Sequence, residues 1–242
     1  MSAHLPVLPI AWPLAIGAIL LLVERRGIAL QRGVAWIGLA GLLALSVALL
    51  RQADAGEIGV YLLGDWPARM GISLLVDRLS AWMVLVTTLL AVACLLHAGS
   101  GWDRRAPHFH ALFQFQLMGL NGAFLTGDLF NLFVFFEILL AASYGLVLHG
   151  SGPVRVKAGM HYIVVNLVAS LLFLIAAALI YGVAGTLNMA ELPQRVAMLG
   201  ADERTLFKLG AVLLGIVFLV KAGAWPLNFW LPAAYGAAAA PV

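Results

Sequence analysis

Long apolar segments limit what this chain can fold into more than any other feature. A helix that crosses a bilayer needs roughly 20 apolar residues, because about 30 Å of hydrocarbon is crossed at 1.5 Å per residue. Six segments fit this length, at residues 5–23, 33–50, 79–98, 111–126, 129–148 and 158–183. A seventh, at 206–235, contains Pro226 and Pro232, and a proline inside a helix breaks a hydrogen bond. The sequence therefore predicts an all-α, polytopic transmembrane helix bundle with about seven spans, the last one broken.

The composition excludes soluble protein classes. Of the 242 residues, 63% are hydrophobic and only 10% are charged, whereas a soluble domain carries about 25% charged residues. The net charge of +3 does not indicate a nucleic-acid partner, because the basic residues lie between the apolar segments. The single cysteine, Cys94, excludes disulfides and an iron–sulfur cluster. No phosphate loop, dinucleotide fingerprint or metal-ligand spacing is present, so we expect no cofactor and no metal.

The loops predict how the chain is oriented and divided. Arg and Lys are concentrated in the short loops after the first, third and fifth segments, which the positive-inside rule places in the cytoplasm. Only residues 51–78 are long enough for a structure of their own, and two short β-prone runs there flank a turn, which predicts a hairpin. No linker or repeat divides the chain, so we expect a single membrane domain over residues 1–242.

Glu137 is an ionisable residue near the middle of an apolar segment. A charge at that depth costs several kcal/mol and is rare without a function, and a glutamate there is too far from either surface to reach water. A carboxyl group held in this way can accept and release a proton. The alternative is a buried ion pair or hydrogen bond that only fixes the packing of helices.

Lys221 is the second such residue, near the middle of the broken segment 206–235. A buried lysine can load and release a proton as the charge of a neighbouring carboxylate changes. The break at Trp225 and Pro226 frees backbone groups, and non-helical backbone at this depth lines a cavity or packs against protein. We therefore expect a broken-helix cavity at Trp225 and Pro226. The alternative is a kinked helix whose lysine pairs with Glu137 without any role in transport.

Other polar residues also lie in or beside the apolar segments. A histidine side chain can gain or lose a proton near neutral pH, so His161 can pass a proton inward from the cytoplasmic end; a hydrogen-bonded structural histidine is an equal alternative. Asp128 begins a segment, where a carboxylate caps the helix. Gln114, Gln116 and Asn121 should face neighbouring helices or water.

Two motifs resemble those of a known family. They are TGDLFNLFVFFE at 126–137 and VKAGAWPLNFWLP at 220–232. Both look like hallmark segments of the proton-conducting antiporter-like family, which includes large membrane subunits of respiratory complex I and of Mrp-type sodium/proton antiporters. The resemblance implies that Glu137 and Lys221 are the family's glutamate and broken-helix lysine. His161 before Tyr162, and the stretch 181–191, look most like the Mrp branch of the family.

The resemblance implies a subunit of a monovalent cation (sodium)/proton antiporter, not an enzyme, in the cytoplasmic (inner) membrane of a bacterium. Its expected partners are other subunits of the Mrp-type complex, the lipid bilayer, protons and sodium. One alternative is a proton-pumping subunit of a complex I-like NADH:quinone oxidoreductase or a membrane hydrogenase. Because the chain stops where the family begins helix 8, a second expectation is a truncated chain that cannot complete proton transfer alone. A truncated assembly subunit that does not transport is therefore the other alternative.

Overall fold

The computed structural model describes residues 4–56, 58–68 and 71–241. It confirms the predicted all-α membrane fold. The helices are α1 (Leu8–Val23), α2 (Ile28–Asp54), α3 (Arg78–Ala98), α4 (Phe109–Leu125), α5 (Leu129–Val147), α6 (Pro153–Ala184), α7 (Leu192–Met198), α8 (Ala201–Lys221) and α9 (Leu231–Ala237). Two short strands, β1 (Gly59–Leu62) and β2 (Ser73–Val76), pair between α2 and α3.

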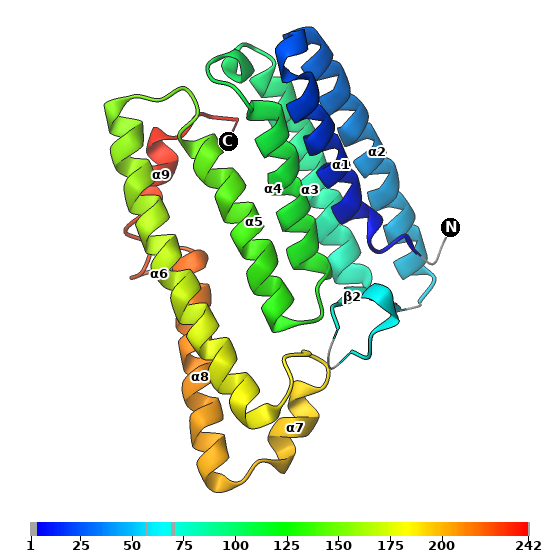
Figure 1. The fold of residues 1–242 in the computed structure, drawn as a ribbon, viewed down its shortest axis with the longest axis vertical. Helices are drawn as coiled ribbons and strands as arrows, with labels where there is room; N and C mark the ends of the chain where they lie inside the picture. Colours follow the sequence, from blue (N-terminus) through cyan, green and yellow to red (C-terminus); the bar gives the residue numbers. More distant parts are fainter. Residues whose placement is uncertain (1–3, 57, 69–70, 242) are drawn as a thin grey trace.

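The helices form two groups that meet at α5 (Figure 1). Helices α1 to α4 pack together on one side of the molecule, and α5 lies against α4. Helix α6 packs against α5 and α8, and α9 lies against α6. Figure 1 shows α8 beginning at the same end of the molecule as α7 and stopping at about half the height of α6. The break predicted in the last apolar segment therefore falls at about half the height of α6.

Five described helices are long and apolar enough to cross a membrane. They are Leu8–Arg26, Ile28–Asp54, Arg78–Ala98, Leu129–Val147 and Pro153–Ala184. Helix α4 has 17 residues and is shorter than these. Helix α8 begins with Asp202, Glu203 and Arg204 and is therefore less apolar. Helix α2 is longer than its apolar segment because polar residues continue it at both ends, and α6 is longer because residues 153–157, which include Arg155 and Lys157, extend its N-terminal end.

The helix ends follow from local sequence. Asp77 begins α3 with a capping box: its side chain accepts a hydrogen bond from the Ser80 N–H at 2.7 Å, and the Ser80 hydroxyl accepts one from the Asp77 N–H at 2.9 Å. The Asp128 side chain accepts a hydrogen bond from the Asn131 N–H at 2.9 Å, so it caps α5. Helix α6 begins at Pro153 and is followed by Gly185 in the left-handed conformation (φ 67°).

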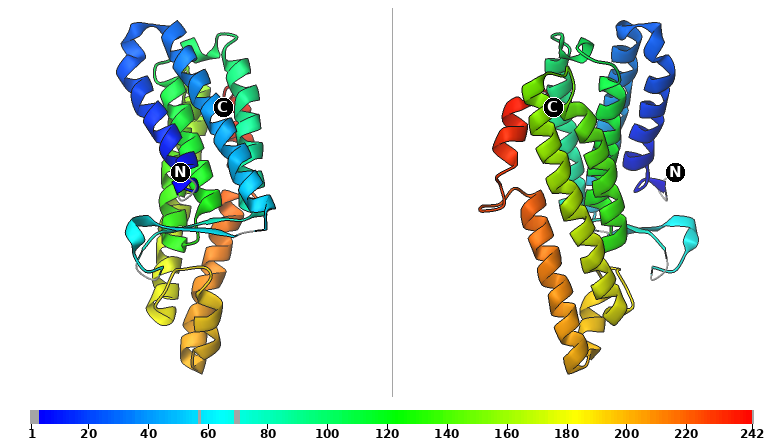
Figure 2. Two further views of the ribbon diagram at one scale, coloured as in Figure 1. Left: turned by 90° about the vertical axis from the view of Figure 1, so that its right-hand side faces the viewer. Right: turned by 60° about the vertical axis from the view of Figure 1, so that its left-hand side comes forward.

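The predicted hairpin and two loops form one end of the bundle. Strand β1 pairs antiparallel with β2, and the hairpin extends sideways from the helices (Figure 2). The Gly127 N–H, between α4 and α5, donates to the Ser73 carbonyl at 2.9 Å, and the Met189 N–H, after α6, donates to the Gly127 carbonyl at 2.9 Å. These backbone bonds join the hairpin, the α4–α5 turn and the α6–α7 loop.

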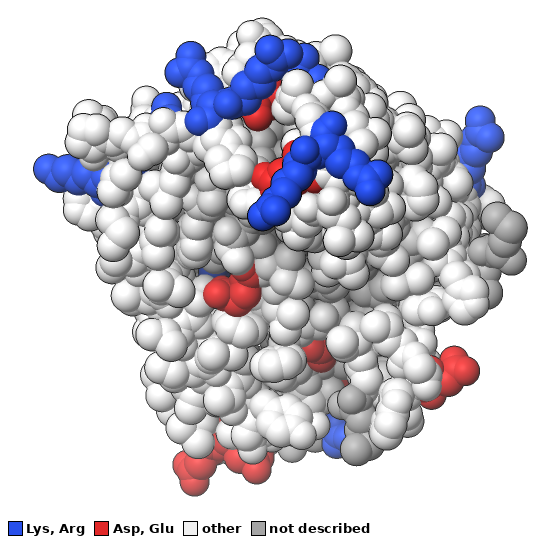
Figure 3. Space-filling view, turned by 45° about the horizontal axis from the view of Figure 1, so that its top comes forward, with Lys and Arg blue, Asp and Glu red and all other residues white. Residues whose placement is uncertain are grey.

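A buried ion pair lies at the opposite end. The three loops that the sequence assigns to the cytoplasm all lie at this end, where Figure 3 shows Lys and Arg side chains gathered. Arg32 of α2 donates to both carboxylate oxygens of Asp103 at 2.7 and 2.8 Å. His110 of α4 contacts Asp103 at 3.2 Å. The Asp103 side chain, which is fully buried, thus connects α2 and α4 to the α3–α4 loop.

We expect protonation of Asp103 to account for part of the stability that the fold loses at acidic pH. Burial favours a higher pKa for Asp103, but the hydrogen bonds and charges of Arg32 and His110 hold that pKa below its ordinary value. A carboxyl group whose pKa is lower in the folded state than in the unfolded state stabilises the fold at pH values above its unfolded-state pKa. This stabilisation is lost as the pH falls through the folded-state pKa. Asp103→Asn should therefore lower stability at pH 7 by about 3 kcal/mol. Thermal unfolding in detergent from pH 7 down to pH 3 should show a smaller acid loss for the variant; an unchanged loss would contradict this role.

Asn121 compensates for a proline inside α1. Pro13 has no N–H, so the Pro9 carbonyl one turn earlier lacks its helical donor. The Asn121 side-chain amide, on α4, donates to that carbonyl at 2.9 Å in a fully buried position. Asn121, one of the three amide side chains of α4, therefore faces a neighbouring helix as expected.

We expect Asn121→Leu to destabilise the protein by about 1–3 kcal/mol, because the Pro9 carbonyl would be buried without a partner. In a Pro13→Ala background, residue 13 supplies its own N–H to that carbonyl, and Asn121→Leu should cost clearly less. The four variants of this double-mutant cycle can be compared by thermal unfolding in detergent. Equal costs in the two backgrounds would show that the two residues are not coupled.

Candidate proton-transfer site

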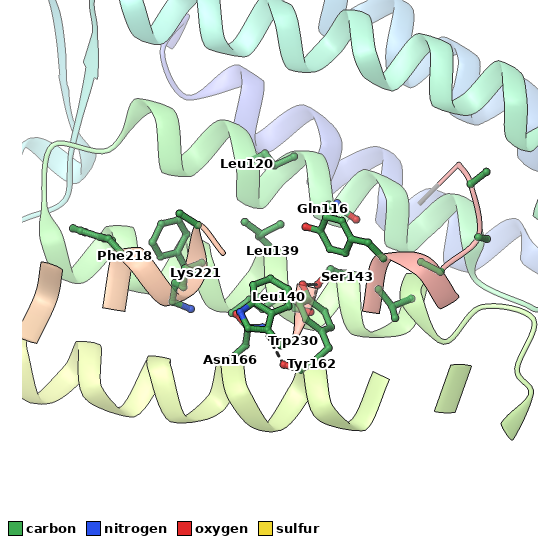
Figure 4. A pocket seen from close by; sticks show the side chains of 17 residues that line it. Gln116, Leu120, Leu139, Leu140, Ser143, Tyr162, Asn166, Phe218, Lys221 and Trp230 are labelled. Atoms are coloured by element: carbon green, nitrogen blue, oxygen red, sulfur yellow. Dashed lines mark hydrogen bonds between the residues drawn. The ribbon is translucent and has the colours of Figure 1, made fainter. Parts of the chain in front are cut away.

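A cavity of about 700 Å³ lies among α4, α5, α6, α8 and α9 (Figure 4). Its wall is mainly apolar, with a few polar side chains from all five of these helices and the chain between α8 and α9. These polar residues are Gln116, Ser143, Tyr162, Asn166, Lys221, Trp230 and Tyr235. A mostly apolar cavity with a few convergent polar groups is the usual form of a binding or transport site.

A hydrogen-bonded chain leads from this cavity to Glu137. Lys221, the last residue of α8, lines the cavity, and its Nζ donates to Ser170 Oγ of α6 at 3.2 Å. The Ser170 hydroxyl in turn donates to Glu137 Oε1 of α5. Ser170 and Glu137 do not line the cavity. The two ionisable residues that the sequence singled out therefore lie on either side of one serine, which the sequence patterns did not identify.

Aromatic rings surround this chain of polar groups. The Nζ of Lys221 lies 5.3 Å from the centre of the Phe136 ring. Phe136 and Phe218 each contact Phe173, with ring centres 6.3 and 5.9 Å apart. Apolar surroundings of this kind lower the local dielectric constant, so charges on Lys221 and Glu137 interact more strongly than they would in water.

The break after α8 differs from the prediction in one respect. Beyond Lys221 the chain turns through residues 222–230, and the Ala224 N–H donates to the Leu219 carbonyl instead of the Val220 carbonyl. The Val220 carbonyl accepts from the Gly223 N–H at 3.1 Å and from the Trp230 indole N–H at 3.1 Å. Trp230 is 3% exposed and lines the cavity, whereas Trp225 is 86% exposed and Pro226 lies beside it on the surface. The predicted placement of Trp225 and Pro226 in the cavity is therefore corrected to Trp230.

His161 also lies outside the cavity. It is exposed on α6, and its neighbour Tyr162 faces inward, because successive residues of a helix point about 100° apart. The Tyr162 and Ser143 hydroxyls are hydrogen-bonded at 2.8 Å. Tyr162, Asn166 and Ser170 follow one another at intervals of four, which places them on one face of α6. This polar stripe, in the apolar part of the helix that follows His161, is the sequence signal that could have identified Ser170.

Two further polar atoms lie buried beside the cavity. Gln116 Oε1 of α4 and Tyr144 Oη of α5 have no hydrogen-bond partner in the part of the chain that the structure describes. The Tyr144 ring contacts that of Tyr162, with centres 5.3 Å apart. Gln116 lines the cavity, so its Oε1 can bond to water that enters it. Within the same described residues, no group of His, Cys, Asp and Glu could hold a metal ion.

Comparison with known proteins relates this chain to membrane subunits of antiporters and of NADH:quinone oxidoreductase. Residues 126–242 match the family model described as NADH:quinone oxidoreductase/Mrp antiporter, transmembrane. The chain is 55% identical over 99% of its length to the D subunit of a probable K(+)/H(+) antiporter of Rhizobium meliloti. It is 39% identical over 96% of its length to the D subunit of an Na(+)/H(+) antiporter of Alkalihalophilus pseudofirmus. The chain covers only 45% and 47% of these two relatives.

Solved structures show the same architecture. The chain resembles a chain of the Mrp complex from a Dietzia species with a TM-score of 0.85 and 35% identity, over 98% of this chain and 44% of that one. It resembles a chain of the membrane-bound sulfane sulfur reductase, an archaeal respiratory membrane complex, with a TM-score of 0.89 and 32% identity, over 98% and 48%. The fold therefore occurs in an antiporter complex and in a respiratory complex.

Proposed function

Because this chain belongs to the NADH:quinone oxidoreductase/Mrp antiporter family, we propose that it carries part of the proton path of a monovalent cation/proton antiporter. The observation that carries the proposal is the chain of polar groups from Lys221 through Ser170 to Glu137, which begins at a cavity inside a membrane bundle. An intramembrane lysine and carboxylate joined in this way are expensive to bury and are typical of proton relays. The protein therefore acts as a transporter subunit and not as an enzyme.

Protons reach the pair through the cavity. Water bonded to Gln116 and to the Ser143–Tyr162 pair connects the cavity mouth to Lys221. A proton that arrives at Lys221 changes the charge of the lysine side chain. Because the surroundings are apolar, this change alters how readily the Glu137 carboxylate binds a proton. His161 is exposed on α6 and does not line the cavity, and the proposed path does not include it.

The cation and the partners follow from the relatives. One relative is named for potassium and another for sodium, so we propose exchange of a monovalent cation that is one of these two. The described residues offer no cluster of carboxylates and histidines for it, and we assign its path to other subunits of the complex. The location that fits this function is the cytoplasmic membrane of a bacterium.

A second function is favoured by the similarity to the sulfane sulfur reductase complex and by 34% identity to the N subunit of an NADH-quinone oxidoreductase. In such a complex the same lysine and glutamate would move protons, driven by electron transfer in a partner subunit. The two functions differ in the source of energy. Only an antiporter exchanges protons for cations when no electron donor is present.

The test is an exchange assay with the complete complex in everted membrane vesicles. An ATP-driven pH gradient is established without a respiratory substrate, and sodium or potassium is then added. We expect one of these cations to dissipate the gradient. Failure of both, together with proton pumping that begins on addition of an electron donor, would replace the antiporter by the redox-driven pump.

A further inference from the structure

We propose that the Ser170 hydroxyl is the relay that carries a proton between Lys221 and Glu137. This inference rests on the proposed function and adds one residue to it. Ser170 is 5% exposed, and its oxygen holds both partners at once: it accepts from Lys221 Nζ at 3.2 Å and donates to Glu137 Oε1. Among the described residues, Lys221 and Glu137 form no direct ion pair with each other.

A hydroxyl is suited to this position because it has one proton to give and two lone pairs to accept one. In the relay step, a proton leaves Lys221 Nζ for Ser170 Oγ while the Ser170 hydroxyl proton moves to Glu137 Oε1. The ammonium becomes an amine, the carboxylate becomes a carboxylic acid, and the serine keeps one proton. The reverse step restores both charges, and no oxidant or reductant is needed.

The separation of the two charges by a serine also has a purpose. A lysine and a glutamate in direct contact in apolar surroundings hold each other in the charged state, because either one alone would be an unpaired buried charge. With Ser170 between them, the proton has a route and the charges do not meet.

The experiment compares Ser170→Ala and Ser170→Thr in the complete complex, in the exchange assay described above, over a range of pH. Ser170→Ala removes the hydroxyl, and we expect exchange to fall about tenfold or more, with a shift in the pH at which exchange is half-maximal. Ser170→Thr keeps the hydroxyl and should restore most of the rate and the original pH profile. Ser46→Ala is the matched control, because Ser46 of α2 is also fully buried and hydrogen-bonded, to Leu42 and Thr88, but lies far from the cavity.

The outcomes separate this inference from the proposed function. If Ser170→Ala retains the wild-type rate and pH profile while variants of Glu137 and Lys221 lose exchange, the relay is refuted and the function stands. If Ser170→Ala and Ser170→Thr are equally slow, the hydroxyl is not what matters, and the relay is again refuted. Thermal unfolding of Ser46→Ala and Ser170→Ala should show similar small losses, so a fall in exchange confined to Ser170→Ala supports the relay.

Discussion

Replacing Glu137 by glutamine is expected to lower cation/proton exchange by about 100-fold or more while the protein still folds and assembles. A group that gives and takes a proton in the rate-limiting step contributes about 10²–10⁴-fold. Glutamine has nearly the same shape, and its Oε1 can still accept the hydrogen bond from Ser170. It cannot be protonated or deprotonated. The variant therefore removes the proton-transfer chemistry and keeps the packing.

This substitution decides between the two interpretations of an intramembrane carboxylate. If Glu137 only holds α5 against α6 by a hydrogen bond, the glutamine variant keeps that bond and transports normally. If it carries protons, exchange is lost without loss of stability. Asp128→Asn is the matched control on the same helix, since asparagine caps a helix as well as aspartate does. Exchange by Glu137→Gln at the level of Asp128→Asn would refute the proton path.

The sequence was sufficient to find the two charged residues of the site because a charge inside a long apolar run is rare and costly. Glu137 and Lys221 stand out in this way without any knowledge of how the helices pack. The same argument locates the apolar spans, because their length is set by the thickness of the bilayer. Their ends are less well determined: α2 and α6 continue beyond the hydrocarbon, where polar residues suit a helix equally well.

The serine between the two charges was not predictable in the same way. Serine is tolerated at low cost in membrane helices and occurs at many contacts, so one serine carries little information. The sequence signal for this face of α6 is the stripe of Tyr162, Asn166 and Ser170. The stripe indicates a site only when it is known that α5 and α8 pack against α6. The choice of His161 shows how sensitive such a prediction is to position: the cavity is lined by its neighbour Tyr162, because successive side chains lie about 100° apart around a helix.

The broken helix shows a second limit. Pro226 and Pro232 indicate that the helix is interrupted, but they do not tell where the chain goes between residues 222 and 230. Which tryptophan returns to the cavity depends on that path, and it is Trp230 that bonds the Val220 carbonyl. The pairing of Asn121 with the Pro9 carbonyl is similar, since it joins residues that are 112 positions apart and depends on the contact between α1 and α4.

Lys221→Arg is expected to lower exchange about 100-fold or more, as much as the removal of the charge by Lys221→Met. A guanidinium remains protonated under all conditions in proteins, so arginine keeps the positive charge and cannot release a proton. The cavity of about 700 Å³ beside Lys221 has room for the larger side chain. Arginine can still donate a hydrogen bond to Ser170, so the contact between α8 and α6 is kept.

A lysine that served only to neutralise Glu137 would be replaced by arginine without loss, because the charge and a donor remain. Equal losses in Lys221→Arg and Lys221→Met therefore indicate that the proton itself passes through this side chain. The double variant Glu137→Gln/Lys221→Met should be no slower than either single variant, because both groups act in one path. Lys208→Arg, at an exposed position of α8, is the matched control and should transport normally. If Lys221→Arg exchanged cations at the rate of this control, Lys221 would contribute only its charge, and the relay through Ser170 would lose its proton donor.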